Sequence, residues 1–305
     1  MSIFKKLSIL VLFTALTVAA NGQSYIQDMA RQSARSDVRT GGTIEKTDLV
    51  AGDSDLRLTI NVPSFEMTLW QNGKEVKKYY IGVGLKEYPI FVGLRNIEMV
   101  IWNPAWIPPS SEWVAPSLRG KVIGPTDPRN PLGKIKMPLG YGYLIHQAKS
   151  ARDLGGLVSH GCVRVMRKDL YDLNDKFLEA QELDLAGEIS RAKRTKRTYV
   201  VNLEEPVRLE VTYDAVVVEA EMLHIYPDVY GFRIDEIGDL RTELKANSID
   251  DAVISDDSLA SMIAKAKKKS QYVVSLEDVE AGKYLNGEVL PVVPNTRKRK
   301  PRRKR

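Results

Sequence analysis

The stretch LRLTINVPSFEMTLWQNGKEVKKYYIGV, residues 56–83, indicates the fold class. Apolar and polar side chains alternate along 56–62 and again along 65–69, and this period of two is typical of half-buried β-strands. Asn72-Gly73 precedes a return strand over 74–83, and both residues of this pair tolerate the positive φ of a tight hairpin turn. The segment therefore predicts strands joined by a hairpin.

The same reasoning extends the strand pattern along the chain. Pro- and Gly-rich loops separate the next β-prone runs, and a helix is expected where Leu170, Leu173 and Phe177 share one face. The sequence as a whole predicts a mainly β core with a few helices. The expected elements are strands at 97–102, 141–146, 207–211 and 216–225, helices at 169–178 and around 259–266, and a basic connector at 191–198.

Composition limits the class of protein. The chain has 305 residues, 43% of them apolar, and one cysteine. This apolar content is ample for a packed core, and the composition excludes a collagen-like chain, a low-complexity chain and an intrachain disulfide scaffold. The formal charge is +6, but eight basic residues lie in the last nine positions, so the rest of the chain carries −2.

The N-terminus has the pattern of an export signal. Lys5 and Lys6 precede an uncharged run over 7–20, which ends in the small and polar residues Asn21-Gly22. A run of this length predicts a cleaved signal peptide over 1–22 rather than a membrane-spanning helix. The polar segment 23–54 reads as a linker, and we expect the mature protein in the periplasm or cell envelope.

Chemistry concentrates around the single cysteine, Cys162, which lies in Ser159-His160-Gly161-Cys162-Val163-Arg164. In an exported protein a lone thiol is an inert core residue, an intermolecular bridge or a reactive group. A nucleophilic thiol needs a base and donors for an oxyanion, and Gly161 would let backbone N–H groups approach a bound carbonyl. His160 and His146, which ends the run Tyr143-Leu144-Ile145-His146, both stand as candidate bases, and spacing alone leaves the choice open.

These residues have other interpretations. His146, His160, Cys162 and His224 could ligate a metal, but they lack the paired spacing of known metal sites, and no cofactor is expected. Arg164 could contact substrate or pair with a carboxylate. Tryptophans near the Pro-rich loops, Trp106 among them, favour packing over glycan stacking.

The motif resembles the L,D-transpeptidase catalytic domain, also called the YkuD domain. That family has an upstream Ile-His-Gly followed by Ser-His-Gly-Cys-Ile/Val-Arg, and here Ile145-His146-Gln147 precedes 159–164. Asn103-Pro104 and the loop 130–133 also match, and the likeness covers about 55–180 in the family's order. Gln147 departs from the pattern, because the family has glycine there; its larger side chain could narrow the donor site or alter the acceptor.

The resemblance implies roles for these residues. Cys162 would be the nucleophile and His146 the general acid/base, while His160 and Gly161 would shape the thiol environment and the oxyanion hole. Ser159 would support the hydrogen bonding around them. Arg164 would fix the active-site loop or a substrate carboxylate. Tyr143 and Trp106 are further candidates for contact with substrate.

The implied fold is an L,D-transpeptidase-like β-sandwich catalytic domain over 55–200. A smaller α+β extension would follow over 201–295, and then a disordered basic tail over 296–305. The extension carries no chemical motif.

The implied activity is acyl transfer on peptidoglycan. The thiol would attack the third-residue carbonyl of a tetrapeptide stem, D-Ala would leave, and an amine of another stem (a 3–3 crosslink), an envelope protein or a D-amino acid would accept the acyl group. Carbapenems would acylate the thiol. The alternatives are an L,D-carboxypeptidase that hydrolyses the same bonds and a non-catalytic wall-binding protein.

The basic tail would bind anionic envelope polymers or simply keep the chain solvated, and no nucleic-acid partner is expected.

Overall fold

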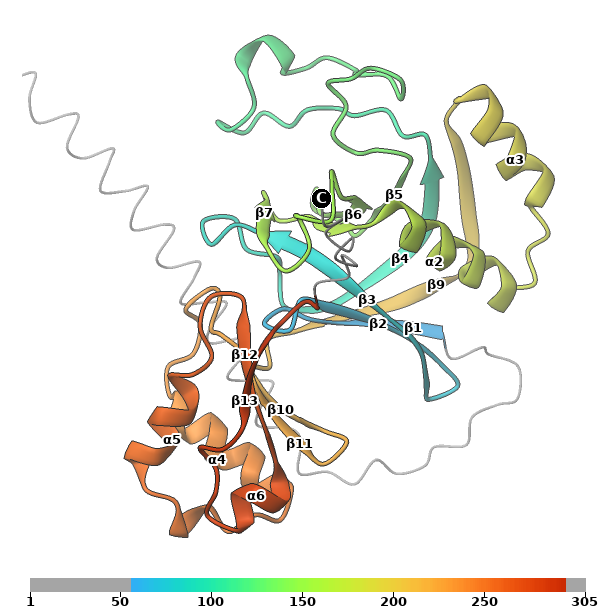
Figure 1. The fold of residues 1–305 in the computed structure, drawn as a ribbon. Helices are drawn as coiled ribbons and strands as arrows, with labels where there is room; N and C mark the ends of the chain where they lie inside the picture. Colours follow the sequence, from blue (N-terminus) through green and yellow to red (C-terminus); the bar gives the residue numbers. More distant parts are fainter. Residues whose placement is uncertain (1–55, 295–305) are drawn as a thin grey trace, which may run out of the picture. The chain divides into compact units, whose positions relative to one another are not determined.

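The computed structural model describes residues 56–294. The signal peptide expected over 1–22, the linker over 23–54 and the tail over 296–305 therefore lie outside the described residues. The expected mainly β fold with a few helices and a smaller α+β part is confirmed (Figure 1). In the described part of the chain, no helix combines the length and the apolar character needed to cross a membrane.

The larger sheet closes on itself. Its order is β2-β1-β9-β4-β5-β6-β8-β3-β7, and β2 also pairs with β3, so eight strands form a barrel-like sheet to which β7 is attached. The strands are β1 (Leu56–Asn61), β2 (Glu66–Gln71), β3 (Lys74–Gly84), β4 (Gly93–Trp102), β5 (Ile135–Pro138), β6 (Leu144–Gln147), β7 (Leu157–Ser159), β8 (Val163–Val165) and β9 (Tyr199–Thr212).

Local sequence explains the first three strands. The side chains of Leu56, Leu58 and Ile60 are buried and their neighbours in β1 are half-buried, which is the predicted alternation. Asn72 and Gly73 both have positive φ, 52° and 72°, as a tight hairpin between β2 and β3 requires. The predicted hairpin is therefore confirmed.

The strand predicted over 141–146 is shorter in the structure. It begins at Leu144, because residues 140–143 form the turn between β5 and β6, where the Tyr143 N–H donates to the Gly140 carbonyl. Tyr141 has a φ of 51° in this turn and is 90% exposed.

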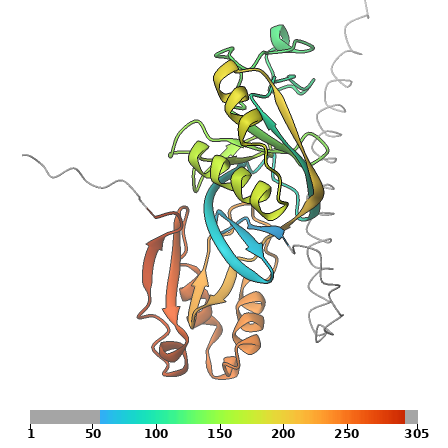
Figure 2. The ribbon, with the colours of Figure 1, turned by 90° about the vertical axis from the view of Figure 1, so that its right-hand side faces the viewer.

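Two helices cover part of the larger sheet. The helix α2 (Arg167–Ala180) packs against β5 and β6, and α3 (Ala186–Thr195) packs against β4 and β9; they appear in yellow-green and yellow in Figure 2. The prediction of a helix over 169–178 is confirmed. The prediction that 191–198 is only a connector is wrong for 191–195, because α3 buries Ile189 and Ala192 and ends at Lys196 with a φ of 57°.

The smaller sheet is antiparallel, in the order β10-β11-β12-β13, and its core includes Leu223, Leu240, Leu259 and Tyr272. The segment predicted as one strand over 216–225 is a hairpin that turns at Ala220 and Glu221. The elements are β10 (Val216–Glu219), β11 (Met222–Ile225), α4 (Glu236–Ala246), α5 (Asp256–Ile263), β12 (Ser270–Ser275), α6 (Leu276–Glu280) and β13 (Glu288–Pro291).

Strand β9 joins the two sides of the larger sheet. It pairs in parallel with β1 and antiparallel with β4. It also crosses residue 200, where the sequence places the end of the catalytic domain, and all of its 14 residues belong to the larger sheet.

Candidate functional site

Cys162 lies in the tight connection between β7 and β8. The buried Ser159 hydroxyl donates a 2.6 Å hydrogen bond to the Cys162 carbonyl and closes this connection. Gly161 has a φ of +106°, which few other residues adopt. The thiol is half-buried, and its Sγ lies 3.9 Å from the Gly142 carbonyl oxygen in the turn before β6. The connection therefore places the thiol at the start of β8, which lies between β6 and β3.

Two glycines allow the backbone to approach closely here. A Cβ on Gly84 would lie 3.0 Å from the Gly161 Cα, and a Cβ on Gly161 would lie 2.7 Å from Cε1 of Tyr143. The Tyr143 ring in turn meets the Phe91 ring edge-on at 5.1 Å. Tyr143 thus packs directly beside the residue that precedes the thiol.

His146 lies in the middle of β6, next to β8. The two strands are parallel, with Ile145 opposite Val163 and His146 opposite Arg164. Because side chains alternate along a strand, His146 and Arg164 lie on one face, and Cys162, two residues before Arg164, falls on that face as well. The register thus places His146 of β6 and Cys162, the residue just before β8, on the same face of adjacent segments.

The His146 ring is almost completely enclosed. The residue is 4% exposed, and its Nδ1 has no hydrogen-bond partner within residues 56–294. Burial and the nearby Arg164 guanidinium lower the pKa of His146 to about 4. Burial also raises the pKa of the Cys162 thiol, against opposing effects of the Leu144 backbone and Arg164. Both shifts favour a neutral thiol and a neutral imidazole at pH 7, rather than a preformed thiolate–imidazolium pair.

His160 occupies a different environment. It is exposed, and its ring stacks on Trp113 with 4.1 Å between ring centroids and an interplanar angle of 9°. The Tyr88 ring is tilted against it, with 4.8 Å between centroids and an interplanar angle of 58°. Of the two candidate bases, His146 is the enclosed one and His160 belongs to an aromatic cluster at the surface. Trp106 lies on the same connection as Trp113, where its backbone pairs with Ile123, but Trp113 is the tryptophan that contacts His160.

Arg164 is engaged in an ion pair. Its Nη1 lies 3.0 Å from Oδ2 of Asp153, and the two side chains are only 12% and 14% exposed. The same Asp153 oxygen accepts the Lys149 N–H at 2.9 Å. The structure therefore shows Arg164 paired with a carboxylate, which is one of its two predicted roles. Sequence reasoning missed Asp153, because nothing in its neighbourhood distinguishes it from other surface acids.

The loops around the site are held by side chains. Asn130 donates to the carbonyl oxygens of Pro104 (2.9 Å) and Gly124 (3.1 Å) and accepts from the Leu132 N–H (3.0 Å). The buried Tyr230 hydroxyl accepts from the Ile90 N–H at 3.3 Å and donates to the Gly84 carbonyl at 3.2 Å. This tyrosine, from the segment before α4, thereby fixes the loop that carries Tyr88.

The remaining histidine does not join the site. His224 lies in β11, where its Nδ1 is 2.9 Å from Oε1 of Gln271. Among residues 56–294, no group of three or more His, Cys, Asp or Glu side chains is arranged to hold a metal ion.

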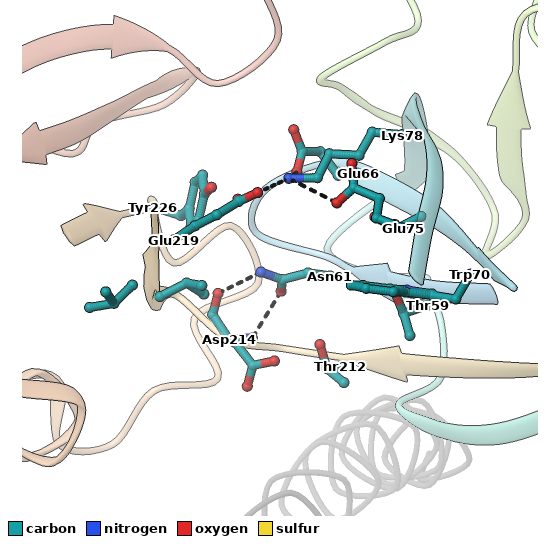
Figure 3. Close-up of a pocket in the computed structure, with 13 residues that line it drawn as sticks. Thr59, Asn61, Glu66, Trp70, Glu75, Lys78, Thr212, Asp214, Glu219 and Tyr226 are labelled. Atoms are coloured by element: carbon teal, nitrogen blue, oxygen red, sulfur yellow. Dashed lines mark hydrogen bonds and ion pairs between the residues drawn. The ribbon is translucent and has the colours of Figure 1, made fainter. Parts of the chain in front are cut away.

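A separate cavity of about 390 Å³ lies beside β1–β3 and β10 (Figure 3). Several of its polar side chains form hydrogen bonds and ion pairs with one another or with nearby backbone. Lys78 bonds with Glu219 and lies 4.0 Å from Glu66, and the Asn61 amide exchanges hydrogen bonds of 2.9 and 3.0 Å with the backbone of Asp214. Neither Cys162 nor His146 lines it.

The site thus combines a half-buried thiol before β8 with an enclosed imidazole in β6, in a closed β-sheet. The family model for the L,D-transpeptidase catalytic domain (YkuD) matches residues 55–189. The probable L,D-transpeptidase YbiS of Escherichia coli K12 is 30% identical over 121 residues, which span 34% of this chain and 40% of YbiS. The chain therefore matches less than half the length of this curated relative.

Solved structures of L,D-transpeptidases show a distant likeness. The enzyme from Mycobacterium smegmatis aligns with a TM-score of 0.33 and 14% identity, over 52% of this chain and 59% of its own. The catalytic domain from E. faecium aligns with a TM-score of 0.34 and 14% identity, over 53% and 99% of the two chains.

Proposed function

We propose that this protein is an exported L,D-transpeptidase that acts on peptidoglycan stem peptides, with Cys162 as its nucleophile. The observation that carries the proposal is the half-buried thiol just before β8, whose alternation places it on the face shared with the enclosed His146 of β6. The match of residues 55–189 to the family model supports the same reaction class.

The first half of the reaction forms a thioester. As the Cys162 sulfur attacks the third-residue carbonyl, its proton passes to His146, which is neutral at pH 7 because its pKa is lowered to about 4. The C–N bond to D-Ala then breaks, and the protonated imidazole gives its proton to the leaving amine. Backbone N–H groups around Gly161, whose φ of +106° sets the direction of the chain before the thiol, would stabilise the oxyanion.

The second half transfers the acyl group. An incoming amine attacks the thioester, His146 removes its proton, and the thiol is regenerated, so neither ATP nor a cofactor is needed. The amine belongs to a second stem peptide, an envelope protein or a D-amino acid. Water as the acceptor would make the protein an L,D-carboxypeptidase instead.

Mass spectrometry after incubation with a disaccharide-tetrapeptide tests this proposal. We expect loss of D-Ala with formation of a crosslinked dimer, and neither product from Cys162→Ala. Monomeric tripeptide alone would indicate hydrolysis, whereas unchanged peptide in the presence of every amine would leave a wall-binding protein. A carbapenem should add its mass to Cys162 and not to Cys162→Ala.

A further inference from the structure

Arg95, near the start of β4, is held between two aromatic rings. Its guanidinium carbon lies 4.1 Å from the centroid of Phe91 and 5.5 Å from that of Tyr141. Cation–π contacts of this kind fix the plane of a guanidinium. The side chain is therefore oriented before any ligand arrives.

The hydrogen-bonding capacity of Arg95 is only partly used. One Nη1 hydrogen bond of 2.8 Å reaches the Leu94 carbonyl, and the buried Nε has no partner within residues 56–294. In the same range no carboxylate forms an ion pair with Arg95, whereas Arg164 pairs with Asp153 and Arg241 with Asp251. A buried N–H without an acceptor is costly, and a planar guanidinium is best satisfied by a carboxylate.

Short contacts connect Arg95 to the thiol site. Phe91, beneath the guanidinium, meets the Tyr143 ring at 5.1 Å, and that ring lies against Gly161. On the other side, Tyr141 immediately precedes Gly142, whose carbonyl lies 3.9 Å from Sγ of Cys162. The same hairpin turn thus borders both the nucleophile and the guanidinium.

We propose that Arg95, with Phe91 and Tyr141, forms a subsite that binds a carboxylate of the peptide substrate. This inference rests on the proposed function. Arg164 is already paired with Asp153, whereas Arg95 forms no ion pair with a carboxylate among the described residues and its Nε has no partner there. An extended peptide spans about 3.3 Å per residue, so a carboxylate within a few residues of the scissile bond can reach it. The terminal D-Ala and an acidic side chain are the two possible sources.

Steady-state kinetics of Arg95→Gln and Arg95→Lys test the subsite. For the acidic tetrapeptide, we expect Arg95→Gln to raise KM about tenfold while kcat stays within about twofold of the wild-type value. The KM of Arg95→Lys should lie between those of the wild type and Arg95→Gln. Arg57→Gln is the matched control, since Arg57 also lies over a ring, 4.9 Å from Trp70, but outside the site; its KM should equal that of the wild type.

Amidated substrates identify the carboxylate. One tetrapeptide carries a carboxamide at D-Ala and a second carries it on an acidic side chain. On the peptide whose amidation removes the bound carboxylate, wild type and Arg95→Gln should have equal KM. An unchanged KM for Arg95→Gln, or an equal rise on every amidated peptide, would overturn the subsite. Equilibrium binding of the tetrapeptide to Cys162→Ala, with and without Arg95→Gln, measures the subsite without catalysis. Absence of turnover by the wild type would refute the proposed function and leave this binding result standing.

Discussion

The side-chain Oε1 of Gln147 accepts a 3.1 Å hydrogen bond from the backbone N–H of Lys134. The same side chain packs against Gly133. Gln147 stands where the related family has glycine, and the structure uses its amide to hold the 130–134 loop. Gly133 has a φ of +74°, and a Cβ on it would collide with the Gln147 side chain. The large residue at 147 thus depends on the small one at 133.

Gly133→Ala should destabilise the protein by about 1–3 kcal/mol, through strain at positive φ and overlap with Gln147. Gly140→Ala is the matched control, because Gly140 also has positive φ, +82°, but no atom lies within 4 Å of its Cβ position. Urea unfolding should show the larger loss for Gly133→Ala. In a Gln147→Gly background the two losses should become similar; if they still differ, the overlap is not the cause.

Asp153→Asn should lower the free energy of unfolding by about 3–5 kcal/mol, since it leaves the guanidinium of Arg164 buried without a counter-charge. The exposed pair Arg129–Asp127, at 2.6 Å, provides the comparison: Asp127→Asn should lower the free energy of unfolding much less, because solvent screens this pair. Denaturant titration measures both. Equal effects would show that the burial of the Arg164 pair contributes nothing.

His146 should make stability depend on pH. Its pKa is about 4 in the folded protein and 6.5 when unperturbed, so the unfolded chain binds the proton more readily. The contribution of the neutral His146 ring to the free energy of unfolding is complete above pH 6.5. It falls by roughly 3 kcal/mol in total as the pH drops from 6.5 to 4. The stability difference between wild type and His146→Gln should therefore shrink across this window. A difference that stays constant from pH 7 to pH 4 would contradict the lowered pKa.

The Cys162 thiol should react slowly with iodoacetamide near pH 7, and the rate should rise only above the ordinary thiol range, because burial raises its pKa. The urea-unfolded protein, with an ordinary thiol pKa of about 8.5, supplies the reference titration. A rate plateau between pH 6 and 8 in the folded protein would instead indicate a standing thiolate–imidazolium pair.

The parts of the fold that the sequence predicted are those with local causes. The alternation over 56–62 and the Asn72-Gly73 turn act between neighbours in the chain, and both appear in the structure. The turn at Ala220-Glu221 could not be seen, because neither residue type favours the φ values of 48° and 62° that they adopt. The helix α3 was hidden by its basic residues, since its buried stripe is only Ile189 and Ala192.

The candidate site divides in the same way. The motif at 159–164 and His146 were visible as residue types with a known chemical use. The pairing of Arg164 with Asp153, the stacking of Trp113 on His160 and the bond from Gln147 to Lys134 depend on how distant segments meet. The charges and sizes of these residues allow many partners, and only the folded sheet selects among them.

Strand β9 has a practical consequence for expressing the catalytic region. The family match ends at residue 189, yet β9 fills the place between β1 and β4 with residues 199–212. A fragment trimmed to the match would open the barrel along two unpaired strand edges, and such edges recruit other chains into aggregates. The smallest fragment worth purifying must therefore retain Thr212.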